Sequence, residues 1–112
     1  MSDTLDRLAE ALERECEADD ALRAAVAVLA EHPGAVWAGI AFLDEGELVL
    51  GPTAGEPDEA RRVRVPISYA GDPVGELRSD GDVEIAVLQR AAEIISPYVL
   101  IGWDTGGEAW EP

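Results

Sequence analysis

Residues 36–50 read VWAGIAFLDEGELVL, and this run carries the clearest structural signal in the chain. Its first eight residues are mostly apolar and uncharged, which is typical of a central strand covered on both faces. An acidic turn, Asp44-Glu45-Gly46-Glu47, places glycine where a positive φ is favoured, and residues 48–50 then return as a second strand. The pattern predicts a β-hairpin.

A second hairpin is predicted further along the chain. Residues 62–67 alternate strictly, so that their apolar side chains face a core and Arg62 and Arg64 face the opposite side. A turn and a fourth strand, residues 74–78, follow, with the charged side chains of that strand on the arginine side. Between the two hairpins, residues 51–61 are expected to form turns and either a polar loop or a single helical turn.

Helices are predicted at both ends of the chain. Residues 1–18 carry an apolar stripe at helical spacing, and a second helix ends at the strong stop signal His32-Pro33-Gly34. Asp19-Asp20 is the candidate cap of that second helix. A closing helix is expected from about Val83, capped by Asp82, with apolar residues over well over half of its circumference.

The composition excludes several classes of protein. The chain has 112 residues with 24 acidic and 8 basic side chains, and the net charge of −16 disfavours binding to nucleic acid. No apolar run approaches the ~20 residues of a membrane span, and no basic flank precedes a hydrophobic segment at its start. One cysteine and one histidine cannot supply a four-ligand zinc site. We expect a cytoplasmic domain without a cofactor or metal, which binds neither nucleic acid nor membrane.

The order of the predicted elements, together with one run of residues, resembles the GAF domain. The run is WAGIAFLDEGELVLGPTAGEP, Trp37 to Pro57, and it is most similar to the free methionine-(R)-sulfoxide reductases of that superfamily, which carry a similar Trp-x-Gly, acidic turn, Leu-Val-Leu-Gly-Pro and Gly-x-Pro. A second matching region, residues 62–80, ends in the Gly-x-Leu pattern of Gly75 and Leu77. The resemblance implies an α+β fold, a GAF-like antiparallel sheet of four or more strands with helices packed mainly on one face.

We interpret the chain as a single GAF-like domain over residues 1–112. Within it we expect an N-terminal helix at 1–18, a core at 20–103 that the resemblance spans, and an acidic tail at 104–112.

The chain departs from the reductase pattern where catalysis would be expected. The resemblance implies a long lid segment with the catalytic cysteines before the final strand pair, but only ten residues separate Gly51 from Arg62. Cys16 matches none of those cysteines. Arg62 and Arg78 stand where the reductases place acids that hold the amino group of free methionine, and Asp80 matches a remaining acid of that pattern. The sequence therefore indicates the fold of the family without its enzymatic activity.

Trp37 and three arginines are the candidate ligand-binding residues. Strand alternation places Arg62, Arg64 and Arg78 on one sheet face, and the resemblance makes it the face that carries Trp37. An indole beside guanidinium groups can hold an anionic or planar ligand through stacking and bidentate hydrogen bonds. The alternative is a solvated face, on which Arg64 pairs with Glu76 and the indole is covered by arginine stems or by the loop after the first hairpin.

Three other features are open to a functional and a structural interpretation. His32 suits the C-terminal end of a helix better than the role of a general base, because no nucleophile accompanies it in sequence. Cys16 is better explained as a small buried hydrophobe than as a redox sensor. The acids between residues 13 and 20 diverge around a helix, which favours a solvated surface over a calcium site.

These observations favour a non-catalytic GAF-like regulatory or protein-interaction module. The alternative is a sensor of a small anionic or planar ligand on the Trp37 and arginine face, and a more distant alternative is an enzyme of the methionine sulfoxide reductase kind. The apolar stripes of the first and last helices predict a homodimer formed through helices, and an unidentified protein partner is a further candidate. The expected interface residues are Leu5, Leu8, Leu12, Ile94 and Tyr98.

Overall fold

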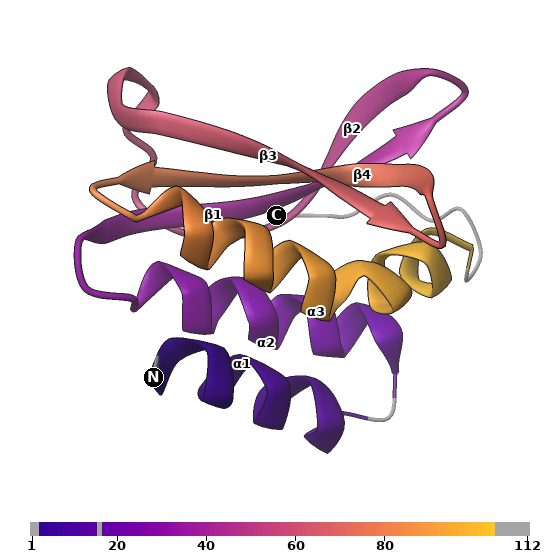
Figure 1. Cartoon of the computed structure of the whole chain (residues 1–112), viewed down its shortest axis with the longest axis horizontal. Coiled ribbons are helices and arrows are strands. Elements are labelled where there is room, and N and C mark those ends of the chain that lie inside the picture. Colours follow the sequence, from indigo (N-terminus) through magenta and orange to yellow (C-terminus); the bar gives the residue numbers. More distant parts are fainter. Residues whose placement is uncertain (1–2, 16, 105–112) are drawn as a thin grey trace.

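The computed structural model describes residues 3–15 and 17–104 as one antiparallel sheet with three helices stacked on one of its faces (Figure 1). In chain order the elements are α1 (Asp3–Arg14), α2 (Ala18–Ala30), β1 (Ala35–Asp44), β2 (Glu47–Gly55), the 3₁₀ turn η1 (Glu59–Arg61), β3 (Arg62–Tyr69), β4 (Asp72–Gly81) and α3 (Ile85–Asp104). The strand order is β2-β1-β4-β3, and all neighbours are antiparallel. This architecture confirms the predicted α+β class, an antiparallel sheet of four strands with helices packed on one face.

The uncharged strand β1 occupies the centre of the sheet, as its sequence predicts. It pairs with β2 on one side and β4 on the other, and its residues from Trp37 to Phe42 are all buried. Ala38, Ile40 and Phe42 face the helices and belong to the main hydrophobic core, which also contains Leu77 of β4. We call this side of the sheet the inner face, and the opposite side the outer face.

All four strands are longer than the sequence predicts, and two of them continue well past their predicted ends. β2 continues past Leu50 to Gly55 through Pro52, which lies on an edge strand and at the irregularity in the β1–β2 register, two places where a residue without an N–H is tolerated. β4 continues past Arg78 to Gly81, because this segment pairs with both β1 and β3. Tertiary pairing overrides the local turn signal in both places.

Two helix starts also differ from the prediction. α3 begins at Ile85 instead of Val83, because the Asp82 N–H donates to the Gly34 carbonyl at 2.8 Å and so ties Asp82 to the sheet. The N-cap of α2 is Glu17, and Asp19-Asp20 lies in the first turn, where its charges suit the helix dipole.

Helix α1 shares the core of the rest of the chain. It packs against α2 and α3 on the side away from the sheet (Figure 1), and Leu8 and Leu12 are buried in the same cluster as the inner face of the sheet. Two contacts fix it to the end of α2. Thr4 Oγ1 lies 2.6 Å from His32 Nδ1, and Arg7 donates to Glu31 at 2.6 Å. His32 therefore joins the start of α1 to the end of α2 through a hydrogen bond with a threonine.

No helix in the described part of the chain has both the length and the hydropathy to cross a membrane.

Candidate functional site

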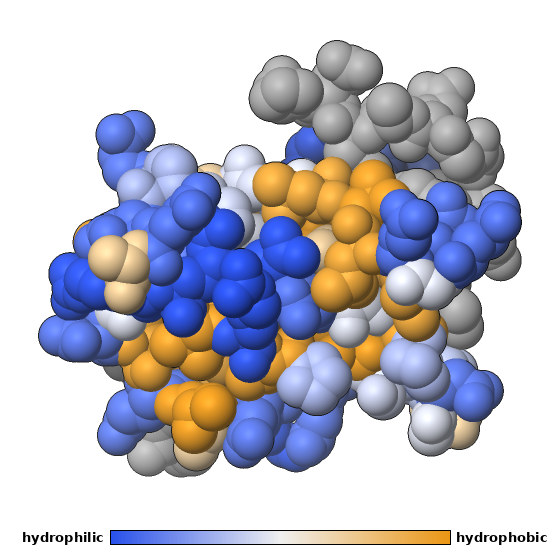
Figure 2. Space-filling view, turned by 90° about the horizontal axis from the view of Figure 1, so that it is seen from above, coloured by the Kyte–Doolittle hydropathy of each residue, from blue (hydrophilic) through white to orange (hydrophobic). Residues whose placement is uncertain are grey.

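The outer face carries all four candidate ligand-binding residues. The strand register aligns Arg62 with Asp80 and Asp80 with Trp37, and in the next outward-facing row Arg64 with Arg78. Figure 2, which looks down onto this face, shows a group of hydrophilic surface in its middle with hydrophobic surface beside it. The three-strand register thus builds a cluster of arginines and acids around one indole.

Trp37 forms the floor of this cluster. Its ring lies over Gly39, since a Cβ atom at Gly39 would come within 2.5 Å of the indole Cη2. Glycine at this position is therefore required for the indole to lie close to the strand. Trp37 is only 5% exposed although none of the described helices lies on this face, and a side chain of the outer face covers it.

Arg62 supplies that cover. Its guanidinium carbon lies 4.4 Å from the centroid of the Trp37 ring, within the range of a cation–π contact. The same guanidinium donates from Nε to Asp80 Oδ1 at 2.8 Å and from Nη2 to Asp80 Oδ2 at 3.0 Å. We call Trp37, Arg62 and Asp80 the outer-face stack.

Asp80 holds the guanidinium of Arg62 in its place over the indole. Its side chain is fully buried, and its Oδ2 also accepts the backbone N–H of Asp58 at 2.6 Å. This contact ties the connection between β2 and β3 to the sheet. The carboxylate therefore meets three donors, and burial of the charge is offset by a bidentate guanidinium and a backbone amide.

These contacts shift both pKa values toward the charged pair. Burial acts most strongly on Asp80 and would raise its pKa, but the hydrogen bonds from Arg62 and Asp58 and the charges of Arg62 and Arg64 together lower it. The hydrogen bond to Asp80 raises the pKa of Arg62. The pair is therefore ionised over the whole physiological range.

The other two arginines share a single acid. Arg78 Nε donates to Glu76 at 2.7 Å, and both side chains are mostly buried. Arg64 approaches the same carboxylate at 3.6 Å across the strand pair, while its side chain remains 56% exposed. The predicted pairing of Arg64 with Glu76 is present, and Arg64 is the candidate residue most open to solvent.

The pairing of Arg62 with Asp80 is not evident from the sequence. The predicted strand ended at Arg78, so the register could not place the acid opposite the arginine. A strand extended by three residues would have aligned them, and the alternation of Arg62 with Arg64 already gave the correct face. Cys16 lies outside the described residues. Among those described, no group of three His, Cys, Asp or Glu side chains is placed to hold a metal ion.

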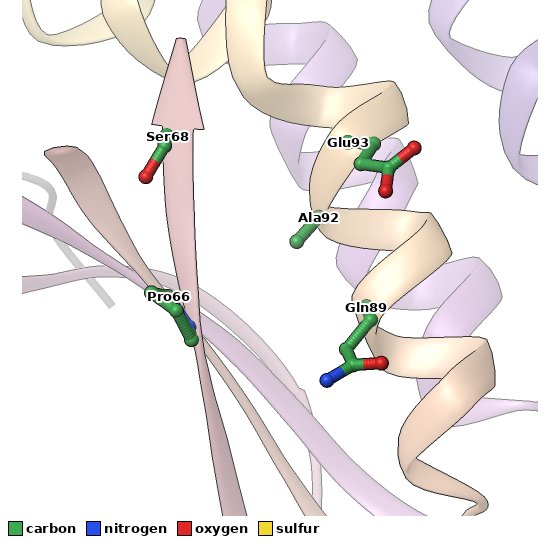
Figure 3. Close-up of a pocket in the computed structure, with 5 residues that line it drawn as sticks. All are labelled: Pro66, Ser68, Gln89, Ala92 and Glu93. Carbon is green, nitrogen blue, oxygen red and sulfur yellow. The ribbon is translucent and has the colours of Figure 1, made fainter. Parts of the chain in front are cut away.

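A groove lies apart from this face, between the edge strand β3 and α3. Its volume is about 290 Å³, and it is lined by Pro66, Ser68, Gln89, Ala92 and Glu93 (Figure 3). The Ser68 and Glu93 side chains in Figure 3 point away from each other, and Glu93 is paired with Arg90 at 2.9 Å. Its polar groups do not converge on one point, so the outer-face stack remains the better candidate site.

The expected interface residues divide into two groups. Leu8 and Leu12 are buried within a single chain, so they are not available at its surface, because α1 folds onto its own α2 and α3. Leu5, Ile94 and Tyr98 are half-buried at the edge of the same core. The homodimer stays a prediction that now rests on the second group alone.

Comparison with solved structures identifies the fold. The GAF domain of the phosphoenolpyruvate-protein phosphotransferase from Acinetobacter superimposes with a TM-score of 0.75 at 17% identity, over 96% of this chain and 100% of that one. The free methionine-R-sulfoxide reductase of Neisseria meningitidis, in complex with its substrate, gives a TM-score of 0.70 at 18% identity, over 90% of this chain and 89% of that one. The fRMsr of Staphylococcus aureus, also with substrate, gives 0.68 at 20% identity, over 86% and 93%.

The likeness is one of structure. No protein-family model matches the sequence, and no curated protein is significantly similar to it. The chain has a GAF-like fold, which both a GAF domain and sulfoxide reductases share.

Proposed function

We propose that this chain is a non-catalytic regulatory or protein-interaction module with a GAF-like fold. The observation that carries the proposal is the outer-face stack, in which Arg62 lies on the Trp37 ring and is held there by buried Asp80. The family resemblance implies a ligand pocket on this face beneath a long lid. Here residues 56–61 are the whole connection from β2 to β3, and the indole is already covered by the chain's own side chain.

The cysteine content also supports a role without catalysis. The chain has one cysteine, Cys16, whereas the resemblance implies catalytic cysteines in a long segment before the final strand pair. The connection from β2 to β3, residues 56–61, contains no cysteine.

A thioredoxin-coupled assay with free methionine-(R)-sulfoxide tests the proposal, with an active reductase as the positive control. We expect no turnover above the rate without protein. Turnover that disappears in Cys16→Ser would contradict the proposal and support the reductase alternative.

A ligand sensor is the second candidate, and the exposed guanidinium of Arg64 favours it. Its imperfect contact with Glu76 leaves donors free for a carboxylate or phosphate. A thermal-shift screen against carboxylates and nucleotides distinguishes this role, with Arg64→Glu as the test variant and Arg90→Glu on α3 as the matched charge reversal. A ligand that binds wild type and Arg90→Glu, fails to bind Arg64→Glu and weakens with salt would establish the sensor instead of the module.

A further inference from the structure

Three consecutive apolar side chains are exposed on β2, which lies at one end of the strand order. Leu48, Val49 and Leu50 are 42%, 40% and 46% exposed, and we call them the β2 ridge. Val49 aligns with Phe42 on the inner face, so Leu48 and Leu50 lie on the outer face. Figure 1 shows the β1–β2 hairpin extending away from the helices, which explains why Val49 is exposed on the inner face. An exposed apolar strand at a sheet edge is typical of an interaction site.

The turn of this hairpin determines which backbone groups of β2 point away from β1. Residues 45–46 have φ values of 52° and 85°, as in a two-residue type I′ turn, in which the flanking residues, here Asp44 and Glu47, exchange backbone hydrogen bonds. Hydrogen-bonded and non-hydrogen-bonded pairs alternate along antiparallel strands, so the N–H and C=O groups of Leu48 and Leu50 point toward the outer edge of β2. The two exposed leucines therefore also carry the backbone donors and acceptors of this edge.

A second copy of the same strand fits this pattern in one antiparallel register. Two β2 strands centred on Val49 place Leu48 of each copy opposite Leu50 of the other as hydrogen-bonded pairs, with Val49 opposite its own counterpart as a non-hydrogen-bonded pair. A pairing centred on Leu48 would place Leu50 opposite Gly46, and one centred on Leu50 would place Leu48 opposite Pro52, which has no N–H to donate. The register centred on Val49 is therefore the one that pairs the whole ridge with itself.

The charges of the hairpin are compatible with this register. Residues 48–55 carry no charged side chain, and Glu47 would lie opposite Gly51 of the second copy. The two copies of Glu47 would be four positions apart along the paired strands, or about 14 Å at ~3.4 Å per residue. This separation exceeds the Debye length of about 8 Å at physiological ionic strength, so their repulsion is screened. The net charge of −16 opposes association at low salt, and we expect pairing to strengthen as the salt concentration rises.

We propose that a second copy of this chain pairs with the edge of β2 in the antiparallel register centred on Val49, which joins two four-stranded sheets into one continuous sheet. The two-fold axis passes through the Val49 pair perpendicular to the sheet, so both copies keep their helices on the same side. A contact of this length is typical of a weak, reversible dimer. It contains no residue of α1 or α3, so it is distinct from the homodimer predicted through the helices, and it does not depend on the proposed function.

Disulfide cross-linking of the full chain tests the register. Cys16→Ser removes the single native thiol, and Val49→Cys in that background places two thiols on a non-hydrogen-bonded pair whose Cα atoms lie about 4.5 Å apart, within the range that a disulfide spans. We expect mild oxidation to give a covalent dimer about tenfold faster than for Glu47→Cys in the same background, because the two copies of Glu47 are too far apart to be bridged.

Sedimentation equilibrium at high salt tests the ridge without cross-linking. Leu50→Glu places a charge opposite an apolar side chain in both copies, and it should raise the dissociation constant of the dimer about tenfold. Ile85→Glu is the matched control, because it adds the same charge at an exposed site at the start of α3 and should leave the dissociation constant unchanged. Circular dichroism shows whether each variant is folded.

Three results would overturn the proposal. Equal cross-linking rates for Val49→Cys and Glu47→Cys would mean that the thiols meet by random collision. A dimer with the same dissociation constant in wild type and Leu50→Glu would place the interface elsewhere, for example on the helices. A wild-type chain that stays monomeric at high salt and high concentration would mean that a second copy does not occupy the ridge.

Discussion

The inner and outer faces of the same sheet bury their side chains by different means. On the inner face, Ile40, Phe42 and Leu77 are fully buried by a layer of helices and need no polar partner. On the outer face, which none of the described helices covers, the guanidinium of Arg62 lies over Trp37 and is itself held by Asp80. The hydrophobic effect that stabilises the inner face does not depend on the orientation of the side chains. On the outer face, the charged groups must keep their hydrogen-bonding geometry for the indole to stay covered. The two faces should therefore respond differently to substitution and to pH.

The largest effect is expected on the inner face. Phe42→Ala removes a large, fully buried side chain between the sheet and the helices and should cost about 3–5 kcal/mol of unfolding free energy. Urea denaturation followed by circular dichroism measures it. A loss below about 1 kcal/mol would mean that the inner face does not hold the fold together.

A slightly smaller loss of unfolding free energy is expected when Asp80 is removed from the outer face. Asp80→Ala leaves Arg62 without its bidentate partner over the indole, and breaking a buried pair costs about 3 kcal/mol. Arg64→Ala is the control, because this half-exposed residue makes only a loose contact and should cost at most about 1 kcal/mol. Equal losses in the two variants would show that the outer-face stack is no stronger than a surface ion pair.

The free energy of unfolding should depend on pH through the outer face, where Asp80 is charged, and not through the apolar inner face. The pKa of Asp80 is lower in the folded chain than its ordinary value of 3.8, so its contribution is complete above that value and is lost as the pH falls through the lower folded pKa. We expect the stability difference between wild type and Asp80→Asn to be constant from pH 7 to about pH 5 and to shrink below about pH 4. A difference that grows on acidification would mean that the folded pKa is raised.

The smallest expected effect is a gain in stability from a substitution at Ser79. Ser79 faces the inner side next to Asp80, and its buried hydroxyl has no hydrogen-bond partner among the described residues. Ser79→Ala removes this unsatisfied group and should stabilise the chain by up to about 1 kcal/mol. The melting temperature of Ser79→Ala, compared with that of the wild type, measures the effect. A lower melting temperature would mean that the hydroxyl has a hydrogen-bond partner in solution.

The sequence predicts the inner face better than the outer face. Period-two alternation in β1 and β3 and the turn residues of both hairpins suffice to place the apolar side chains, because hydrophobic patterning is local. The outer-face stack depends on the register between β3 and the last three residues of β4, which local turn signals conceal. Arg62 was therefore assigned to the correct face but not to its partner.

Helix α1 illustrates the same limit at the other end of the chain. Its apolar stripe is correctly predicted, but the sequence does not say whether a stripe meets a second copy or the same chain. The structure places Leu8 and Leu12 in the core of one chain. Light scattering at low and high salt tests the remaining homodimer prediction, and a monomeric mass under both conditions would contradict it.

A double-mutant cycle on Arg62→Ala and Asp80→Ala tests the central claim that one charged pair closes the outer face over Trp37. If the two residues act as a unit, the double variant should lose less stability than the sum of the single variants, by at least about 1.5 kcal/mol in urea denaturation at pH 7. Additivity within about 0.5 kcal/mol would contradict it, because Arg62 and Asp80 would then stabilise the chain independently and the indole would not be held beneath their contact.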